Sequence, residues 1–192
     1  HSAFRRQRQM CIRDSLYADT ELVREYVDSR GFLFNQDVNP LYNFGTNQNN
    51  WSLGASRVTL KYSEKTTVIW KLDADQYSRF IADGYAPNTD AVAHNFITRD
   101  GYEDILQAPT VVVIPGPLYN DEATTLPSVL TVGVGPVTIF HEGKYIEGTW
   151  RRNDISDPFE FLDTNQNKID VPPSKQWIHL LPLNGEITIS DN

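Results

Sequence analysis

Residues 133–152 read GVGPVTIFHEGKYIEGTWRR and carry the strongest β-strand signal in the chain. Residues 137–140 and 145–150 are rich in β-branched and aromatic residues, and residues 141–143 (HEG) between them suit a short hairpin turn. Upstream, the run 128–134 stops at Gly135-Pro136, a pair that favours a turn. We therefore expect strands that follow one another as an antiparallel meander.

The same period of two extends to residues 56–62 and 66–72, which residues 63–65 (SEK) connect as a hairpin. Six apolar residues alternate with polar ones and are expected to share a face: Val58, Leu60, Tyr62, Val68, Trp70 and Leu72. Residues 110–114 (TVVVI) form a β-branched run before 115–117 (PGP), which predicts a strand buried on both faces and then a hard turn.

Further short strands are expected at residues 168–171, 176–181 and 186–189, and one short helical turn near 100–107. Strand signals at intervals of 8–12 residues are typical of all-β sandwiches. The predicted fold class is mainly β (α+β): an antiparallel β-sandwich or curled meander sheet with one N-terminal helix.

That helix is predicted over residues 19–31. Asp19 or Thr20 can cap its start, apolar residues recur at helical spacing, and Gly31 can end it. Residues 35–55 follow as a linker or an ordered long loop, because they are dense in Asn, Gln, Gly and Pro. The β-rich domain is then expected over residues 56–192.

The net charge of −8 and the isoelectric point near 4.9 argue against nucleic-acid binding. No run of about 18 apolar residues exists, so we expect no membrane span. Outside the first 14 residues there is no cysteine, which excludes disulfides, thiolate zinc sites and a cysteine nucleophile from that part of the chain.

The first 14 residues differ in composition from the rest. They hold four arginines, the only cysteine and the only methionine. Residues 6–15 (RQRQMCIRDS) resemble a translated sequencing-adapter read-through of metagenomic assemblies. We therefore expect residues 1–14 to be non-native or a disordered tail, and residues 15–34 to be the helical remnant of a truncated upstream domain.

An ordered series of motifs runs through the C-terminal half: residues 133–140 (GVGPVTIF), 142–144 (EGK) and 148–152 (GTWRR), then Asp157-Pro158, Phe161, Asp163, Pro172, Lys175 and Trp177-Ile178. This series resembles the C-terminal domain of the YerB-like lipoprotein family (domain of unknown function 3048). Residues 56–58 (SRV), Trp70 with Asp73, and 77–80 (YSRF) fit the start of the same domain. Residues 15–31 look like the last element of that family's N-terminal domain, so the resemblance covers residues 15–183.

Two turns depart from the family pattern: residues 165–167 are Asn-Gln-Asn instead of part of Asp-x-x-Gly, and residues 173–175 are Pro-Ser-Lys instead of Pro-Gly-Lys. The resemblance implies a bacterial, extracytoplasmic, lipid-anchored protein whose signal and first domain lie upstream. It implies no catalytic residues, because the function of the family is not established.

Four carboxylates are the candidates for catalysis: Asp154, Asp157, Glu160 and Asp163. A glycosidase needs an acid and a second carboxylate roughly 5 to 9.5 Å apart, which a sequence cannot show. A solvated acidic loop is the favoured interpretation. Asp163-x-Asn165-x-Asn167 matches the start of a calcium loop, but Lys168 and Ser174 occupy the positions of its glycine and its bidentate glutamate, so a polar turn is favoured.

No metal ligand set and no cofactor is predicted. His94, His141 and His179 are scattered without paired spacing, and His141 beside a hairpin turn is expected to be exposed. Nucleotide and serine-hydrolase motifs are missing from the sequence.

The tryptophans Trp70, Trp150 and Trp177 are expected in the core with bonded indole N–H groups. The alternative is an aromatic binding platform, for which the candidates are Trp51, Tyr42, Phe44 and Tyr85. These features favour a non-catalytic binding or structural domain, and the resemblance implies that it belongs to the bacterial cell envelope. It would contact an envelope polymer or protein partner through loops 84–107 and 151–167. The alternative is an envelope glycan hydrolase that uses carboxylates of residues 154–163, completed by the missing N-terminal domain.

Overall fold

The computed structural model describes residues 20–31, 39–48, 50–83, 91–98, 100–120, 122 and 126–191. The chain divides into two compact units, His1–Val38 and Asn39–Asn192, and each is described by itself. Residues 1–14, predicted to be non-native or a disordered tail, lie outside the described residues.

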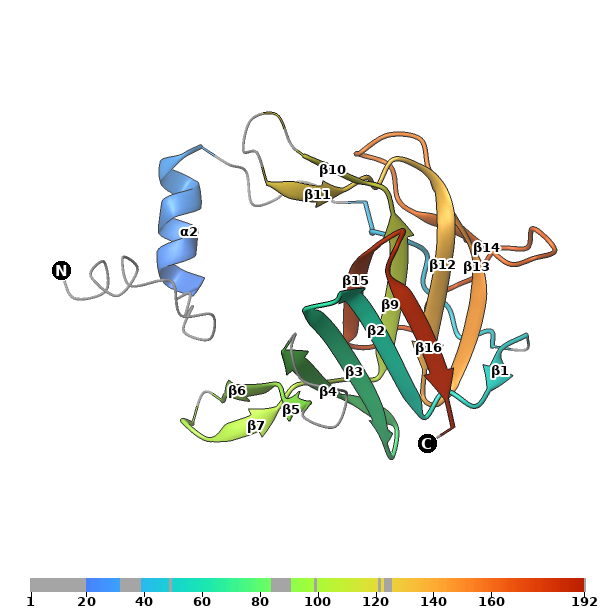
Figure 1. Ribbon diagram of the computed structural model, residues 1–192. Helices are drawn as coiled ribbons and strands as arrows, with labels where there is room; N and C mark the ends of the chain where they lie inside the picture. Colours follow the sequence, from blue (N-terminus) through green and yellow to red (C-terminus); the bar gives the residue numbers. More distant parts are fainter. Residues whose placement is uncertain are drawn as a thin grey trace. The chain divides into compact units, whose positions relative to one another are not determined.

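In the first unit, helix α2 spans Thr20–Ser29, which confirms the predicted helix (Figure 1). Gly31 follows just beyond its end, and its φ of 73° lies in the left-handed region that glycine adopts most readily after helices. Its apolar face is exposed: Leu22, Val23 and Tyr26 keep 59%, 48% and 58% of their surface accessible. No helix in the described part of the chain is long and apolar enough to cross a membrane.

The second unit is built around two β-sheets (Figure 1). The first has the spatial order β1-β13-β12-β9-β15, with β14 paired to β13. Its strands are β1 (Ser52–Leu53), β9 (Thr110–Gly116), β12 (Gly133–His141), β13 (Lys144–Arg152), β14 (Glu160–Leu162) and β15 (Gln176–Pro182).

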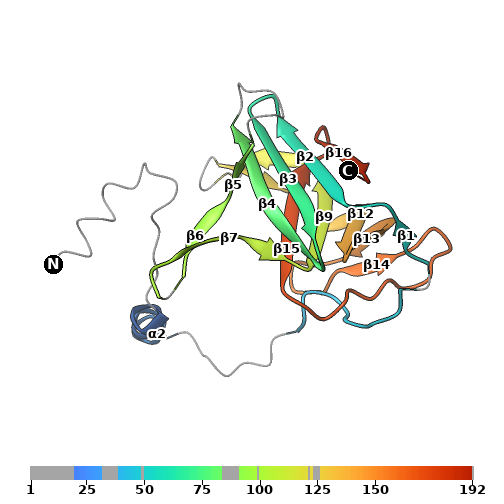
Figure 2. The ribbon, with the colours of Figure 1, turned by 90° about the horizontal axis from the view of Figure 1, so that it is seen from below.

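The second sheet has the order β16-β2-β3-β4-β5, with β8 paired to β4 (Figure 2). Its strands are β2 (Arg57–Ser63), β3 (Thr66–Asp73), β4 (Gln76–Asp83), β5 (Val92–Ala93), β8 (Gln107–Ala108) and β16 (Glu186–Ser190). Two small antiparallel pairs complete the unit: β6 (Asn95–Ile97) with β7 (Glu103–Ile105), and β10 (Leu118–Asn120) with β11 (Pro127–Val129).

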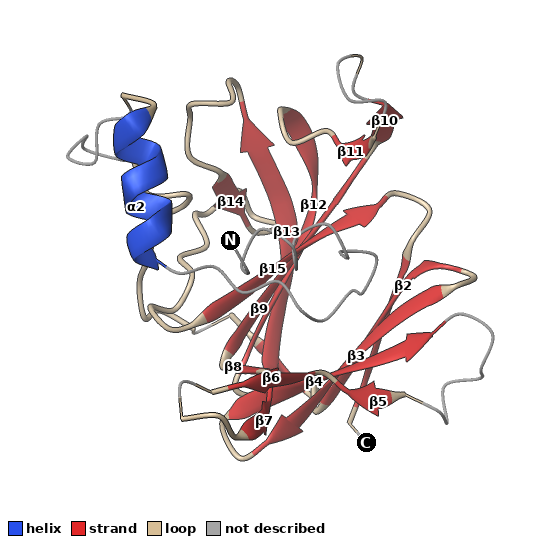
Figure 3. Ribbon diagram, turned by 90° about the vertical axis from the view of Figure 1, so that its left-hand side faces the viewer, coloured by secondary structure: helices blue, strands red, loops and turns tan. Residues whose placement is uncertain are grey.

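The predicted mainly-β fold is confirmed, and strands dominate the described residues (Figure 3). Strand β9 lies between two hydrophobic cores because its side chains alternate in direction. Val111 and Val113 join Val58, Leu60 and Trp70 in the core that the second sheet covers. Every residue of β9 is buried, so the prediction of a strand buried on both faces is correct.

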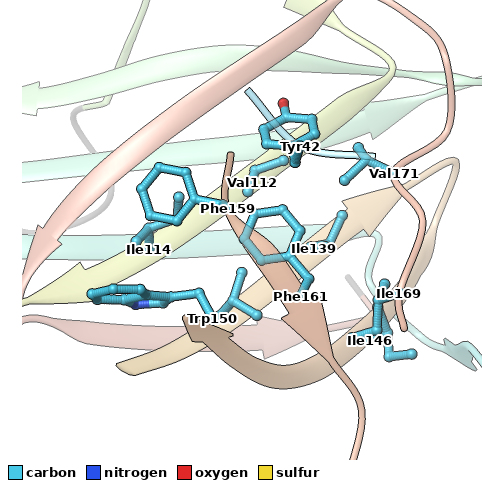
Figure 4. Close-up of a cluster of buried hydrophobic side chains, with 11 residues drawn as sticks. Tyr42, Val112, Ile114, Ile139, Ile146, Trp150, Phe159, Phe161, Ile169 and Val171 are labelled. Carbon is cyan, nitrogen blue, oxygen red and sulfur yellow. The ribbon is translucent and has the colours of Figure 1, made fainter. Parts of the chain in front are cut away.

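The other face of the first sheet is covered by loops rather than by a third sheet (Figure 4). Val112 and Ile114 of β9 pack there with Trp150 and with side chains from the connecting segments. Those segments contribute Tyr42, Phe159, Ile169 and Val171, and the short strand β14 contributes Phe161. The core therefore depends on residues outside the long strands.

Residues between 39 and 55 also help to cover this face of the first sheet. Tyr42 is 1% exposed and bridges to Phe159, while Phe44 bridges to Val171. Within the stretch predicted as a linker or an ordered long loop, Tyr42 and Trp51 pack on this core, and Ser52–Leu53 form strand β1 of the first sheet.

The expected turn at Gly135-Pro136 is wrong, because β12 runs straight through both residues. A Cβ atom on Gly135 would lie 2.7 Å from Nε1 of Trp150, so the glycine makes room for the indole on the neighbouring strand. Pro136 lies where β12 pairs with β13 alone, since the pairing with β9 begins at Thr138. A residue without an N–H group is tolerated at such a one-sided position.

Three further expectations need correction. The short helical turn near 100–107 is instead the β6–β7 hairpin, in which Gly101 adopts a φ of 84°, followed by β8. Residues 168–171 make isolated bridges and not a strand. Strand β15 pairs with β9 in parallel, so the first sheet is mixed and not purely antiparallel.

Candidate functional site

A pocket of about 460 Å³ lies where several turns of the second unit converge. We call it the turn pocket. The loop 46–48, the β3–β4 turn, the β12–β13 turn and the segment 172–175 before β15 surround it. Its lining residues are Thr46, Gln48, Asp75, Gln76, Pro109, His141, Glu142, Pro172, Pro173, Ser174 and Lys175. This volume is within the range of small-ligand sites.

Tight hairpins position two walls of the turn pocket. The β12–β13 turn has left-handed φ values of 49° at Glu142 and 79° at Gly143, as a two-residue type I′ turn requires. The hydroxyl of Tyr77 accepts a bond from the Gly143 N–H and donates to the Ala55 carbonyl, which fixes this turn to β4. In the β3–β4 turn, Ala74 is held at a φ of 55°, a region that favours glycine.

A chain of polar groups leads from the rim of the turn pocket into the protein. The Ser174 and Thr110 hydroxyls lie 2.6 Å apart, and Thr110 Oγ1 lies 2.8 Å from Nδ1 of His141. Nε2 of His141 faces the Glu142 carboxylate at 3.3 Å. Thr110 is fully buried and His141 is 7% exposed, so the expectation of an exposed His141 is wrong.

Burial lowers the pKa of His141, and the nearby Lys144 ammonium acts in the same direction. The Glu142 carboxylate and the Pro109 carbonyl oppose this effect. His141 is therefore neutral near pH 7 and offers one donor and one acceptor nitrogen.

Two opposite charges stand at the rim. Lys175 and Asp75 line the turn pocket and are exposed. Neither has an ion pair within the described residues. Three prolines and two glutamines supply apolar and amide surface between them. The arrangement can hold a small polar ligand that carries both hydrogen-bond donors and hydrogen-bond acceptors.

A second polar cluster lies in the core between the sheets. The Trp70 indole N–H donates to Nε2 of His179 at 2.8 Å, so Nε2 is an acceptor and the ring proton is on Nδ1. Nδ1 in turn lies 2.5 Å from the Tyr62 hydroxyl. Burial lowers the pKa of His179 to about 3, helped by the positive charge of Arg79, and burial raises the pKa of Tyr62 to about 12.

Arg79 completes this cluster from β4. Its guanidinium carbon lies 4.8 Å from the centre of the Trp177 ring, and its Nη1 bonds to Nδ1 of His94. Its Nε is buried and has no hydrogen-bond acceptor in the described structure. No described carboxylate lies within ion-pair distance of it.

Two of the predicted catalytic carboxylates, Asp154 and Asp157, stabilise one exposed turn. Asp154 Oδ1 accepts from the N–H and the hydroxyl of Ser156, and Asp157 Oδ2 accepts from the Asp154 N–H at 3.0 Å. Arg152 donates from Nε to the Asp157 carbonyl at 2.7 Å. The Ser156 bonds lower the pKa of Asp154.

The other two carboxylates are engaged as well. Asp163 Oδ1 accepts from the N–H groups of Asn165 and Asn167, both at 2.8 Å, and Oδ2 accepts from the Asn167 amide at 3.1 Å. These bonds close a polar turn, as predicted in preference to a calcium loop. Glu160 is held by Arg151 at 2.6 Å and Lys168 at 3.3 Å.

Hydrogen bonds lower the pKa of both Glu160 and Asp163. A glycosidase acid instead needs a raised pKa so that it stays protonated near pH 7. In the described chain there is also no group of three or more His, Cys, Asp or Glu residues able to hold a metal ion.

The aromatic candidates that the structure describes, Tyr42, Phe44 and Trp51, do not form one exposed platform. Tyr42 is buried, with its hydroxyl bonded to Gln176, and Phe44 is 50% exposed beside it. Trp51 is partly buried against the first core, and Tyr85 lies outside the described residues. Trp70 and Trp150 are core residues with bonded indole groups, as predicted, and Trp177 is partly buried.

The turn pocket was not among the sequence candidates. Two short sequence motifs contribute to this pocket: Glu142-Gly143 in a two-residue hairpin turn, and the Pro-Pro-Ser-Lys segment 172–175 before a strand. Each is an ordinary turn by itself, and only the fold brings them together.

These features define a β-sandwich domain with a pocket among its turns. The chain belongs to the DUF3048 family, since the model for the "protein of unknown function (DUF3048) C-terminal domain" matches residues 58–178. The crystal structure of the YerB protein from Bacillus subtilis is similar, with a TM-score of 0.62 and 16% sequence identity over 89% of this chain. The match spans 54% of the YerB chain, and at this identity the likeness concerns the fold. A comparison with curated proteins finds no match.

Proposed function

We propose that this chain is a non-catalytic binding or structural domain of an extracytoplasmic bacterial envelope lipoprotein. In this proposal the turn pocket holds a polar part of an envelope polymer or of a partner protein. The turn pocket carries the proposal, because it presents unpaired charges of both signs, hydroxyls, amides and proline surface in one accessible volume. Ligand sites that combine apolar surface with a few converging polar groups have this composition.

The state of the carboxylates supports binding over hydrolysis. Asp154, Asp157, Glu160 and Asp163 all make hydrogen bonds or ion pairs that stabilise local turns and strands. Hydrogen bonds lower the pKa of Asp154, Glu160 and Asp163, the opposite of what a general acid requires. An envelope glycan hydrolase is the competing proposal, and it would need these same side chains for turnover.

The proposed location rests on the resemblance to lipoproteins noted in the sequence. It includes an additional domain in a longer chain and a lipidated N-terminus, and the lipidated N-terminus would place this β-domain outside the cytoplasmic membrane. Sequencing the source DNA upstream of codon 15 tests this part. A continuous frame that reaches a signal peptide with a lipidation cysteine supports it, and a start codon next to residue 15 contradicts it.

Co-sedimentation with purified, insoluble bacterial cell wall tests the binding. Lys175→Gln removes one of the unpaired charges at the turn pocket and is expected to weaken binding by about tenfold, as for the loss of one hydrogen bond to a charged group. Asp157→Asn is the matched control and should bind like the natural chain. Equal binding by all three proteins would contradict a role for the turn pocket.

A further inference from the structure

Among the described residues, strand β15 ends the first sheet and pairs on one side only. Its only partner strand in the described residues is β9, and the opposite end of the sheet is β1, which has two residues (Figure 2). The outer edge of β15 is therefore the longer of the two free edges of this sheet.

The hydrogen-bond register shows which backbone groups point outward. The Thr110 N–H donates to the Lys175 carbonyl, and the Leu183 N–H donates to the Gly116 carbonyl. In a parallel pair alternate residues bond to the same neighbour, so the odd-numbered residues 175 to 183 face β9. The N–H and C=O groups of Gln176, Ile178 and Leu180 consequently point away from the sheet, together with the carbonyl of Pro182.

This edge has little of the usual protection. Exposed edge strands are commonly blocked by charged side chains, bulges or prolines, which prevent another strand from pairing. The three outward positions are Gln176, Ile178 and Leu180, none of them charged, and Leu180 is 41% exposed. A proline occurs only at the last position of the strand. A ladder of free N–H and C=O groups is complementary to one chemical partner, an extended polypeptide.

A positive charge lies close to this edge. Trp177 of β15 stacks under the guanidinium of Arg79, whose Nε has no acceptor. The alternating side chains of an added strand would project toward this face at every second position. A carboxylate there would supply a counter-charge to the Arg79 guanidinium, which has no carboxylate partner among the described residues.

We propose that the outer edge of β15 accepts an extended segment of a partner protein as an added strand, with an acidic side chain directed to Arg79. This interaction uses the backbone of β15 and differs from the binding proposed for the turn pocket. It goes beyond that function, and either can hold without the other.

Amide hydrogen exchange and NMR titration of the full chain test the proposal. Without ligand, the amides of Gln176, Ile178 and Leu180 should exchange rapidly while those of Trp177, His179 and Leu181 are protected. The probe is a synthetic nine-residue peptide in which Thr and Val alternate and the central residue is Glu. Its addition should shift and protect the three outward amides, and the same peptide with a central Lys should bind at least about fivefold more weakly.

Two sets of variants test the backbone pairing and the recognition of charge separately. Leu180→Pro removes one outward N–H without touching the β9 ladder and should weaken peptide binding about tenfold, whereas Leu180→Ala keeps the N–H and should bind within about twofold. Arg79→Gln should abolish the preference for Glu over Lys.

Four results would overturn the proposal. The outward amides could be protected without peptide at all concentrations, which would show that the edge is already covered. Their protection could vanish on dilution, which would assign the edge to a second copy of the chain. The peptide could leave these amides unshifted, or bind equally well with Glu and Lys.

Discussion

The buried pair of Trp70 and His179 makes the stability of the domain depend on pH in a specific way. His179 is 3% exposed and has a pKa of about 3 in the folded chain, against 6.5 for an unperturbed histidine. Between these values the unfolded chain binds a proton that the folded chain excludes. The stability from this group is therefore complete above pH 6.5 and is lost as the pH falls toward 3.

The size of the effect follows from the two pKa values. From the linkage of protonation to folding, the free energy of unfolding falls by about 0.8 kcal/mol at pH 6 and by about 2 kcal/mol at pH 5, relative to pH 7.5. His179→Gln removes the titrating group but keeps an acceptor for the Trp70 N–H and a donor for the Tyr62 hydroxyl. We expect this variant to lose about 2 kcal/mol less stability than the natural chain between pH 7.5 and pH 5.

Urea unfolding at both pH values measures this difference. Tyr62→Phe is the matched control, because it lowers stability but leaves the buried imidazole in place and so keeps the full pH dependence. Parallel pH profiles for the natural chain and His179→Gln would refute the reasoning, since another group would then account for the loss.

Three further substitutions test the local packing by urea unfolding at pH 7.5. Ala74→Gly relieves a φ of 55° and should stabilise the domain by about 0.5 to 1 kcal/mol, and a loss of stability would show that the turn is not strained. Gly135→Ala places a methyl group 2.7 Å from Trp150 Nε1 and should destabilise by about 1 to 3 kcal/mol, whereas Gly101→Ala has open space and should lose only the smaller penalty of its positive φ. Asp163→Ala removes three acceptor contacts of the 163–167 turn and should lose about 1 to 3 kcal/mol, with Asp163→Asn intermediate; equal stability of all three proteins would refute a structural role.

Much of the fold could be predicted from local patterns. The alternation around Val58, Leu60 and Trp70 identified the face that packs in the core, and the run 110–114 identified the central strand. These predictions succeeded because burial on a strand repeats every two residues. Gly135-Pro136 misled because the two residues favour turns on average, while here the Trp150 ring on the next strand requires the glycine.

Contacts between distant segments could not be predicted. Tyr42 is buried against residues more than 100 positions later in the chain, and nothing in the composition of residues 35–55 indicates this. The turn pocket combines residues 46–48, 75–76, 141–142 and 172–175, whose proximity depends on the order of strands in two sheets. The parallel pairing of β15 with β9, which creates the free edge, also follows from topology.

The most direct test of the proposed function is an NMR titration of the full chain with soluble fragments of bacterial cell-wall glycan, with mass spectrometry of the fragments in the same samples. The account predicts shifts at the amides of Gln48, Glu142 and Lys175 around the turn pocket, while the fragments keep their length. Shortened fragments, with cleavage that Asp157→Asn abolishes, would contradict it and establish the hydrolase instead.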